Sequence, residues 1–277
     1  MSFSFDQLAG VGSVAVMGII NLSPDSFYAG NRCATVEEAV RHAENMVEEG
    51  AHVLDVGAES TRPGSQAIGE ETELKRLAPV ISALAKRVPV PVSVDTSKPA
   101  VADRVLQEGA QIINDVAGLQ SHPEMSRIIA RHGAGVVVMH MQGVPETMQD
   151  NPQYGDVVED VLEFLRLSVE TAGSAGIAPR SIAVDPGIGF GKTLEHNLKL
   201  IGSLRRFKVL DKPVLIGVSR KSFIGRILDL DAEERLEGSL AAGVAGVING
   251  ADILRVHDVR ATVRAVRIAH AIREAGG

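Results

Sequence analysis

The sequence predicts an α/β protein, a single-domain (β/α)8 TIM barrel, from three observations. Short apolar runs alternate strictly with longer helical patterns, eight times along 277 residues. The apolar runs are continuous, as in parallel strands that are covered on both faces. A length of 277 residues suits eight such units closed into one barrel. We therefore expect a single domain over residues 1–277.

Eight segments have the length and composition of buried strands. They are rich in Val and Ile and are bounded by glycine, proline or polar residues. The expected strands cover residues 13–20, 52–58, 90–95, 111–116, 135–140, 181–185, 213–219 and 252–257. Because a helical pattern follows each strand, the strands should lie parallel in one sheet.

The segments after the strands carry helical patterns with start and stop signals. The expected helices cover residues 35–50, 71–87, 98–109, 122–133, 157–176, 193–207, 232–251 and 259–275. Thr35 is a candidate N-cap with Glu38 three residues later, and Gly50 is a stop signal. Pro99 falls in a first turn, and a short helical lead-in begins at Lys221. An open doubly wound sheet, the alternative fold, more often has a glycine fingerprint after its first strand, and none is present.

Composition excludes several functional classes. A net charge of −7 argues against a general nucleic-acid binder, and 3% aromatic residues leave few platforms for stacking bases. The single cysteine, Cys33, cannot form an internal disulfide, and no Cys/His spacing indicates zinc. The first residues lack a signal-peptide pattern and no apolar run reaches membrane-spanning length. We expect a cytoplasmic protein.

Polar residues crowd the carboxyl ends of the expected strands, where barrels of this type place their active sites. One Asp or Asn at such a position is often only a helix cap. Nearly every strand here ends in this way, so the side chains should converge on one cavity. The residues concerned are Asn21, Asp95, Asn114, Asp115, Met139, His140, Asp185, Arg220, Lys221, Arg255 and His257.

Three chemical groups separate among these residues and Arg62 of the segment 59–70. Asp95, Asn114 and Asp185 suit a flat heterocycle rich in N–H and C=O groups, because a carboxylate accepts two parallel hydrogen bonds from a guanidine-like edge. Asn21 is a neutral oxygen ligand that suits Mg²⁺ whose other ligands are water and phosphate oxygens. The cationic group suits a phosphate or pyrophosphate and comprises Arg62, Arg220, Lys221, Arg255 and His257.

The segment "DPGIGFGKT", residues 185–193, is similar to a nucleotide-binding P-loop, but Pro186 stands where the first glycine of that motif should be. We interpret it as a glycine-rich loop after the sixth strand. Its glycines allow positive φ angles or close approach to a ligand, and Phe190 at its tip can cover a ring. Two long segments, 21–31 and 59–70, are expected to act as lids.

Seven motifs at successive strand ends together resemble the dihydropteroate synthase family. They are "NLSPDSF", "DVGAESTRPGS", "SVDTSK", "INDV", "DPGIGFGKT", "GVSRKSF" and "RVHDV". The resemblance implies a pterin-binding barrel that condenses p-aminobenzoate with 6-hydroxymethyl-7,8-dihydropterin diphosphate, giving 7,8-dihydropteroate and pyrophosphate in folate biosynthesis. It also implies Mg²⁺ as cofactor, a homodimer, and membership of a family that is the target of sulfonamides.

The resemblance also implies roles for individual residues. The pterin-binding group is Asp95, Asn114 and Asp185, with Lys221 alongside and Met139 at the pocket wall. The metal ligand is Asn21, and the diphosphate ligands are Arg255 and His257. The p-aminobenzoate group is Thr61, Arg62, Pro63, Phe190, Ser219 and Lys221. The residues expected to act in catalysis are Asp95, Lys221, Arg255 and His257.

Pyrophosphate leaves when a carbon–oxygen bond breaks. If this bond breaks before the amine attacks, ionised Asp95 or Asp185 would stabilise the cationic methylene. Three other functions remain open at this stage. They are a methyltransferase acting on methyltetrahydrofolate, a catalytically silent pterin-binding homologue, and an aldolase that forms a Schiff base on Lys221.

Overall fold

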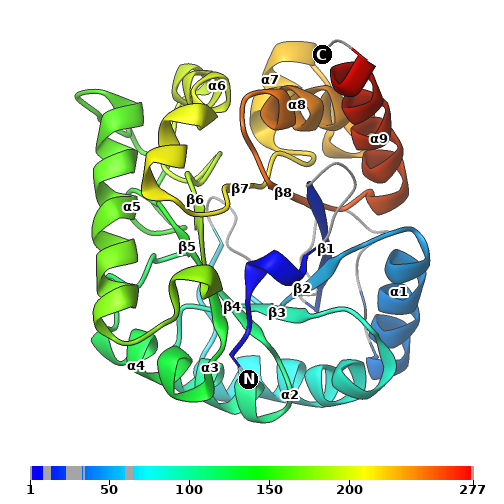
Figure 1. Ribbon diagram of the computed structural model, residues 1–277, viewed down its shortest axis with the longest axis vertical. Helices are drawn as coiled ribbons and strands as arrows, with labels where there is room; N and C mark the ends of the chain where they lie inside the picture. The colour runs from blue at the N-terminus through cyan, green and yellow to red at the C-terminus, as the bar shows by residue number, and fades with distance from the viewer. Residues whose placement is uncertain (1, 9–13, 23–32, 34, 60–64, 276–277) are drawn as a thin grey trace.

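Eight parallel strands form a ring at the centre of the molecule, and helices cover the outside of the ring (Figure 1). The structure is a computed structural model that describes residues 2–8, 14–22, 33, 35–59 and 65–275. The strands are β1 Ala15–Asn21, β2 Val53–Gly57, β3 Val92–Asp95, β4 Ile112–Asp115, β5 Gly135–Met139, β6 Ile182–Asp185, β7 Leu215–Ile216 and β8 Ile253–Val256. They pair in the order β6-β5-β4-β3-β2-β1-β8-β7, and a bridge between Val184 and Val214 closes the ring.

Each expected helix has a counterpart in the structure. The α-helices of the described residues are α1 Val36–Glu48, α2 Glu70–Arg87, α3 Pro99–Gln107, α4 Pro123–His132, α5 Val157–Ser174, α6 Leu194–Gly202, α7 Ser222–Leu228, α8 Leu236–Ile248 and α9 Val259–Ala275. The helical lead-in expected from Lys221 is the separate helix α7. It ends at Asp229, which takes a left-handed φ of 57° and donates its N–H to the Gly225 carbonyl at 2.8 Å.

The signals read at the helix ends agree with the structure. The Thr35 hydroxyl accepts a hydrogen bond from the Glu38 amide at 3.2 Å, as an N-cap does. Gly50 follows α1 with a φ of +101°, a conformation that favours glycine. Pro99 begins α3, where a missing N–H leaves no gap in the helical hydrogen bonds. These local signals therefore mark both ends of α1 and the start of α3. Two other expected helices have different bounds, because the expected helix 193–207 is divided into α6 and the 3₁₀ helix η4 (Leu204–Leu210), and the expected helix 232–251 is α8 over Leu236–Ile248.

The seventh strand is shorter than expected. The apolar run predicted a strand over residues 213–219, whereas β7 covers only Leu215–Ile216. After β7 the chain leaves the sheet, and Arg220 takes a left-handed φ of 55°. Apolar composition reports burial, which continues through Val218, but strand pairing ends earlier. This early departure positions Ser219, Arg220 and Lys221.

A small core fills the ring, and a larger core lies between the ring and the helices. The N-terminal segment completes the inner core, with Phe3 and Phe5 in edge-to-face contact at 5.1 Å. The 3₁₀ turn η1 (Phe5–Gln7) lies across the end of the barrel that faces the viewer in Figure 1. The inner core that includes Phe5 also includes Ala15, Val53 and Ile112, the first residues of β1, β2 and β4, so this end is the amino end of the barrel.

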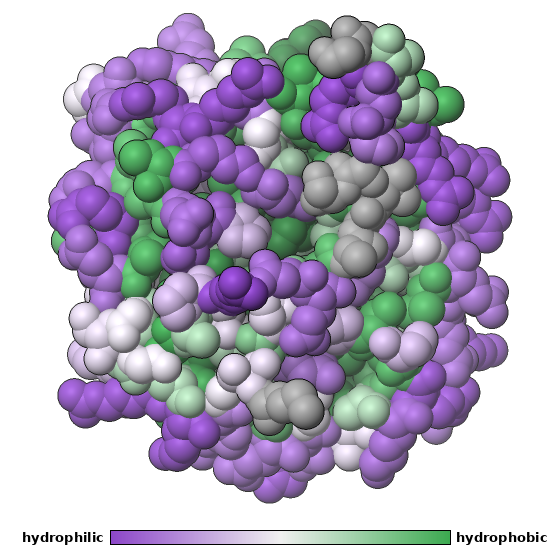
Figure 2. All heavy atoms as spheres, viewed as in Figure 1, coloured by the Kyte–Doolittle hydropathy of each residue, from purple (hydrophilic) through white to green (hydrophobic). Residues whose placement is uncertain are grey.

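The amino end is mostly hydrophilic on its surface, as Figure 2 shows. A cavity of about 960 Å³ opens there, far from the carboxyl ends of the strands. Its cations already have partners, because Arg180 pairs with Asp6 at 3.1 Å and Lys208 pairs with Asp252. The carboxyl end of the barrel is therefore the better candidate for the functional site.

No helix in the described part of the chain is long and apolar enough to span a bilayer.

Candidate active site

The centre of the site is Arg255 on β8, which joins two carboxylates. Its Nε donates to Asp55 Oδ2 at 2.6 Å and its Nη2 donates to Asp95 Oδ2 at 3.0 Å. Asn114 on β4 also donates to Asp55 Oδ2, at 3.2 Å. Asp55 Oδ2 therefore connects Arg255 with Asn114, and the Asp55 side chain is fully buried.

Asp55 was not among the predicted site residues. It lies within the β2 run "HVLDVGA" rather than at its end, so a search of strand ends passes over it. The available signal was a charged side chain inside an otherwise apolar strand, because a buried charge requires a partner. The structure supplies that partner from β8, 200 residues away along the chain.

Three buried polar atoms near this centre have no hydrogen-bond partner among the described residues. They are Asp55 Oδ1, Ser93 Oγ and Asn114 Oδ1, from the neighbouring strands β2, β3 and β4. Buried polar atoms are nearly always paired, because an unpaired one loses its hydration without compensation. Acceptors gathered in this way suit a ligand that carries several N–H groups.

Two further carboxylates have pKa values above their ordinary range. Burial raises the pKa of Asp95 to about 7 against the opposing charge of Arg255, and Asp55 adds to the rise. Burial also raises the pKa of Asp185, against the opposing charge of Lys221. Asp185 Oδ1 accepts a hydrogen bond from the Gly187 amide at 2.7 Å. Shifts of this kind in a cluster of charged groups are typical of active sites.

Lys221 is the N-cap residue of α7 and contacts the glycine-rich loop. Its Nζ donates to the Ile188 carbonyl and lies 4.6 Å from the centre of the Phe190 ring. Burial lowers the pKa of Lys221 to about 8, against the opposing charge of Asp185. The amine is therefore protonated at neutral pH and is close to losing its charge.

The glycines of the segment 186–192 allow the chain to pack closely on its neighbour. Gly187 and Gly191 have φ angles of +69° and +61°. A Cβ atom on Gly187 would lie 1.9 Å from the His140 carbonyl, and one on Gly191 would lie 2.4 Å from the Gln142 carbonyl. Positive φ angles were expected here, and the close approach is to the protein backbone.

Lys192 occupies the position that a P-loop lysine would take, but it is buried away from any phosphate site. Its Nζ lies 2.9 Å from His140 Nδ1 and donates to the Phe190 carbonyl at 3.0 Å. Burial lowers the pKa of Lys192 well below its ordinary value. Burial, with a smaller effect from Lys192, lowers the pKa of His140 to about 3, so the ring is neutral and its Nδ1 accepts.

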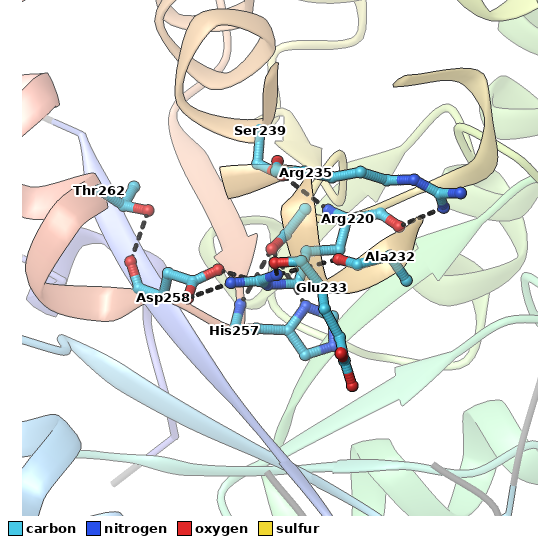
Figure 3. Close-up of polar contacts among 9 residues, drawn as sticks. Arg220, Ala232, Glu233, Arg235, Ser239, His257, Asp258 and Thr262 are labelled. Carbon is cyan, nitrogen blue, oxygen red and sulfur yellow. Dashed lines mark hydrogen bonds and ion pairs between the residues drawn. The ribbon is translucent and has the colours of Figure 1, made fainter. Parts of the chain in front are cut away.

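Arg220, which was expected among the cations that suit a phosphate, has its described partners within the fold. Its guanidinium forms a two-pronged ion pair with Asp258, at 2.8 and 2.9 Å (Figure 3). It also donates to the carbonyls of Ala232 and Glu233 at 2.9 and 2.8 Å. The left-handed backbone at Arg220 directs the side chain toward α9, where it links two segments of the fold.

His257 is oriented by Ser219. The Ser219 hydroxyl oxygen accepts from the His257 amide at 3.2 Å and lies 3.0 Å from His257 Nδ1. These two contacts hold the imidazole at the end of β8, where a ring N–H suits donation to an anion. Arg255 lies two residues before His257 on the same strand end.

Comparisons with known proteins show the family to which the chain belongs. A family model described as pterin binding enzyme matches residues 17–257. The dihydropteroate synthase of Escherichia coli strain K12 is 46% identical over 256 residues, which are 92% of this chain and 90% of that protein. The chain belongs to the dihydropteroate synthase family. It is thus a transferase of folate biosynthesis, and the predicted fold and activity are confirmed.

Solved structures of dihydropteroate synthases superpose closely on this chain. The Yersinia pestis enzyme, solved with a sulfonamide drug, gives a TM-score of 0.93 at 41% identity, covering 99% of this chain and 100% of that one. The Xanthomonas albilineans enzyme, solved with 4-aminobenzoic acid, gives a TM-score of 0.88 at 42% identity, with 99% of both chains covered. The (β/α)8 barrel is therefore shared over the whole described chain.

Two other predicted residues of the dihydropteroate synthase site lie at strand ends, as expected. Asn21 is the last residue of β1 and faces Gly57 in register. Met139 is the last residue of β5, is buried, and faces Asp185 in register. Thr61, Arg62 and Pro63 lie outside the described residues, as does most of the segment 21–31 expected to act as a lid.

Two strand-end residues that were considered with this group serve the fold instead. Asp115 accepts hydrogen bonds from the amides of Ala117 and Leu119, at 3.0 and 2.7 Å, and so holds the turn after β4. His140 is engaged with Lys192. A polar strand end alone does not separate a residue that holds a turn from one that binds a ligand.

The oxygen atoms available at the site suit a magnesium ion that is bound mainly by phosphate oxygens and water. No group of three His, Cys, Asp or Glu side chains that would hold a metal occurs in the described ranges. The side-chain amide oxygen of Asn21 is a hard neutral donor at the site end of β1. Mg²⁺ commonly binds to one or two protein oxygens while phosphate oxygens and water complete its shell.

Proposed function

We propose that the pterin ring of 6-hydroxymethyl-7,8-dihydropterin diphosphate binds against Asp95, Asn114 and Asp185, with Met139 at the pocket wall. The observation that carries this proposal is the buried centre around Arg255, whose neighbours leave acceptor atoms unpaired. A ring with a guanidine-like edge supplies the missing N–H donors. The diphosphate then lies toward Arg255 and His257, the cations of the same strand end.

The reaction breaks the carbon–oxygen bond to the diphosphate and forms a carbon–nitrogen bond to the arylamine. The electron pair of the broken bond leaves with pyrophosphate, and the amine loses a proton. Arg255 and His257 would donate to the leaving oxygens, and preorganised donors of this kind each contribute about 3–4 kcal/mol to transition-state stabilisation. Ionised Asp95 or Asp185 would stabilise positive charge on the methylene carbon.

The p-aminobenzoate side of the site is proposed at Phe190, Ser219 and Lys221, with Thr61, Arg62 and Pro63. The contact of Lys221 Nζ with the Phe190 ring supports this side, because the two groups together offer a charge for a carboxylate and a face for a ring. The Xanthomonas albilineans dihydropteroate synthase was solved with 4-aminobenzoic acid, which supports this acid as a ligand of the present chain. Sulfonamides would compete at this position.

Several properties of the whole molecule are also proposed. Mg²⁺ would bind Asn21 and, when bound, would neutralise charge on the diphosphate. Residues 1–277 would form one pterin-binding domain, located in the cytoplasm. A homodimer is supported by exposed apolar side chains on α7, α8 and α9, namely Ile227, Ile248, Ile268 and Ile272.

One assay tests the proposed function. The protein is incubated with p-aminobenzoate, the pterin diphosphate and Mg²⁺, and dihydropteroate and pyrophosphate are measured together. We expect equal amounts of both products, loss of turnover with EDTA, and recovery with added Mg²⁺. A folded sample that makes neither product would refute the proposal. Trapping of a carbonyl substrate on Lys221 by borohydride would support the aldolase alternative instead.

The activity should peak in a narrow range of pH. Asp95 is protonated below its pKa of about 7, and Lys221 loses its proton above its pKa of about 8. If the carboxylate and the ammonium are the active forms, kcat/KM for the pterin diphosphate falls on both sides of this interval. A pH profile measures both limbs.

Lys221→Arg provides the control for the alkaline limb. A guanidinium stays charged at high pH, so this variant should have a lower rate but no alkaline decline. The acid limb should remain, because Asp95 is unchanged. An alkaline decline that persists in Lys221→Arg would assign that limb to a different group.

A further inference from the structure

Four consecutive carbonyl groups of the glycine-rich loop accept hydrogen bonds from side chains. The donors differ at every position: Ile188 accepts from Lys221, Gly189 from Gln149 at 2.7 Å, Phe190 from Lys192 at 3.0 Å, and Gly191 from the Tyr154 hydroxyl at 2.7 Å. Most protein loops satisfy such carbonyls with water or their own backbone. Side-chain donors at all four positions indicate that these hydrogen bonds determine the conformation of the loop.

Gln149 and Tyr154 hold the loop on both sides of Phe190. Both lie in the segment 140–156 between β5 and α5, and their donors reach the carbonyls of Gly189 and Gly191, the residues directly before and after Phe190. The Gly189 amide is held as well, since it donates to Asn197 Oδ1 at 2.6 Å. The backbone around Phe190 is thus attached to α6 and to the segment 140–156.

A loop with three glycines requires such attachments to stay in one conformation. Gly187, Gly189 and Gly191 all have positive φ angles, and glycine loses more conformational freedom on ordering than any other residue. Phe190 sits between two of these glycines, so its ring position depends on theirs. The ring in turn lies 4.6 Å from Lys221 Nζ.

We propose that Gln149 and Tyr154 are positioning residues for the arylamine substrate. They fix the carbonyls that flank Phe190 and thereby hold its ring beside Lys221, which sets the affinity of the site for p-aminobenzoate. The pterin side of the pocket, formed from strand ends, does not depend on them. This inference rests on the proposed function, because it assigns Phe190 to the p-aminobenzoate side.

Two substitutions remove the donors and keep the shape of the side chains. Tyr154→Phe removes only the hydroxyl group, and the ring keeps its edge-to-face contact with His196 at 4.9 Å. Gln149→Met keeps the length of the side chain without its amide. Gln153→Met is the matched control, since Gln153 lies in the same segment and its side chain donates to Asn151 rather than to the loop.

Steady-state kinetics with each substrate varied in turn tests the proposal. We expect Gln149→Met and Tyr154→Phe each to raise KM for p-aminobenzoate about fivefold, the usual effect of losing one hydrogen bond. KM for the pterin diphosphate should stay within about twofold, and Gln153→Met should match the wild type. An unchanged KM for p-aminobenzoate, or an equal rise in both KM values, would overturn the proposal.

The Phe190→Ala background shows whether the effect passes through Phe190. If it does, adding Gln149→Met or Tyr154→Phe to Phe190→Ala changes KM for p-aminobenzoate by less than about twofold. A full additional effect would show that the two donors act by another route, which contradicts the proposal.

Hydrogen exchange separates a failure of this proposal from a failure of the proposed function. Amide exchange in residues 187–191 should be faster in Gln149→Met and Tyr154→Phe than in the wild type and in Gln153→Met. Unchanged exchange would refute the positioning role even in an active enzyme. If wild type and Gln153→Met make no dihydropteroate, the proposed function fails, and the p-aminobenzoate role fails with it.

Discussion

Replacing Asp55 by alanine is expected to lower kcat/KM for the pterin diphosphate by about a hundredfold or more. Asp55 Oδ2 accepts from both Arg255 and Asn114, so its loss releases two groups of the site at once. Arg255 would retain one carboxylate, Asp95. Breaking a buried ion pair from one side typically costs about 3–5 kcal/mol, so the free energy of unfolding should fall as well.

The variant Asp55→Asn separates positioning from stability. Asparagine keeps the volume and one acceptor oxygen but removes the negative charge opposite Arg255. Thermal unfolding and kinetics are measured for both variants. We expect Asp55→Asn to fold cooperatively and still lose most of its activity. Wild-type rates in Asp55→Asn would show that Asp55 has no part in orienting Arg255.

Replacing Asp185 by asparagine is the second change with a large expected effect, about a hundredfold or more in kcat/KM. Asp185 Oδ1 already accepts from the Gly187 amide at 2.7 Å. Asparagine can keep that bond through its oxygen, and its NH₂ group then replaces the second carboxylate oxygen. A donor would face the N–H groups of the pterin, where an acceptor is required.

Binding of the pterin diphosphate by calorimetry measures this effect apart from turnover. Asp103→Asn is the control, because Asp103 forms a surface ion pair with Arg131 at 2.7 Å and lies on α3. We expect Asp103→Asn to bind as the wild type does and Asp185→Asn to bind weakly while folding normally. Equal affinity in the two variants would remove Asp185 from the pterin-binding group.

Much of the candidate site could be predicted from the sequence because strand ends can be predicted. Asp95, Asn114 and Asp185 are the last or next-to-last residues of β3, β4 and β6, and a closed ring of parallel strands brings such positions to one end. Asp55 was not predicted as a site residue because it lies within β2 rather than at the end of the strand. Its importance follows from Arg255, and no local pattern in the sequence relates residues 55 and 255.

For the glycine-rich loop, too, some features could be predicted from the sequence and others depend on the folded structure. The segment "DPGIGFGKT" itself predicts a glycine-rich loop and excludes a P-loop. The donors Gln149 and Tyr154 were not, since an isolated Gln or Tyr in a long connecting segment carries no signal of its partner. Their hydrogen bonds to Gly189 and Gly191 span 40 and 37 residues and exist only once β5 and β6 pair.

The sequence by itself determined the order and type of the strands and of the helices that follow them, because apolar periodicity, capping residues and glycine stops act over a few neighbouring residues. The tertiary structure decided which cation serves the site. Arg220 and Arg255 look alike as strand-end arginines, yet the left-handed turn at Arg220 directs it to Asp258, while Arg255 stays on β8 and meets Asp55 and Asp95. The direction of a long side chain depends on backbone angles and on partners across the ring, and both exist only in the folded chain.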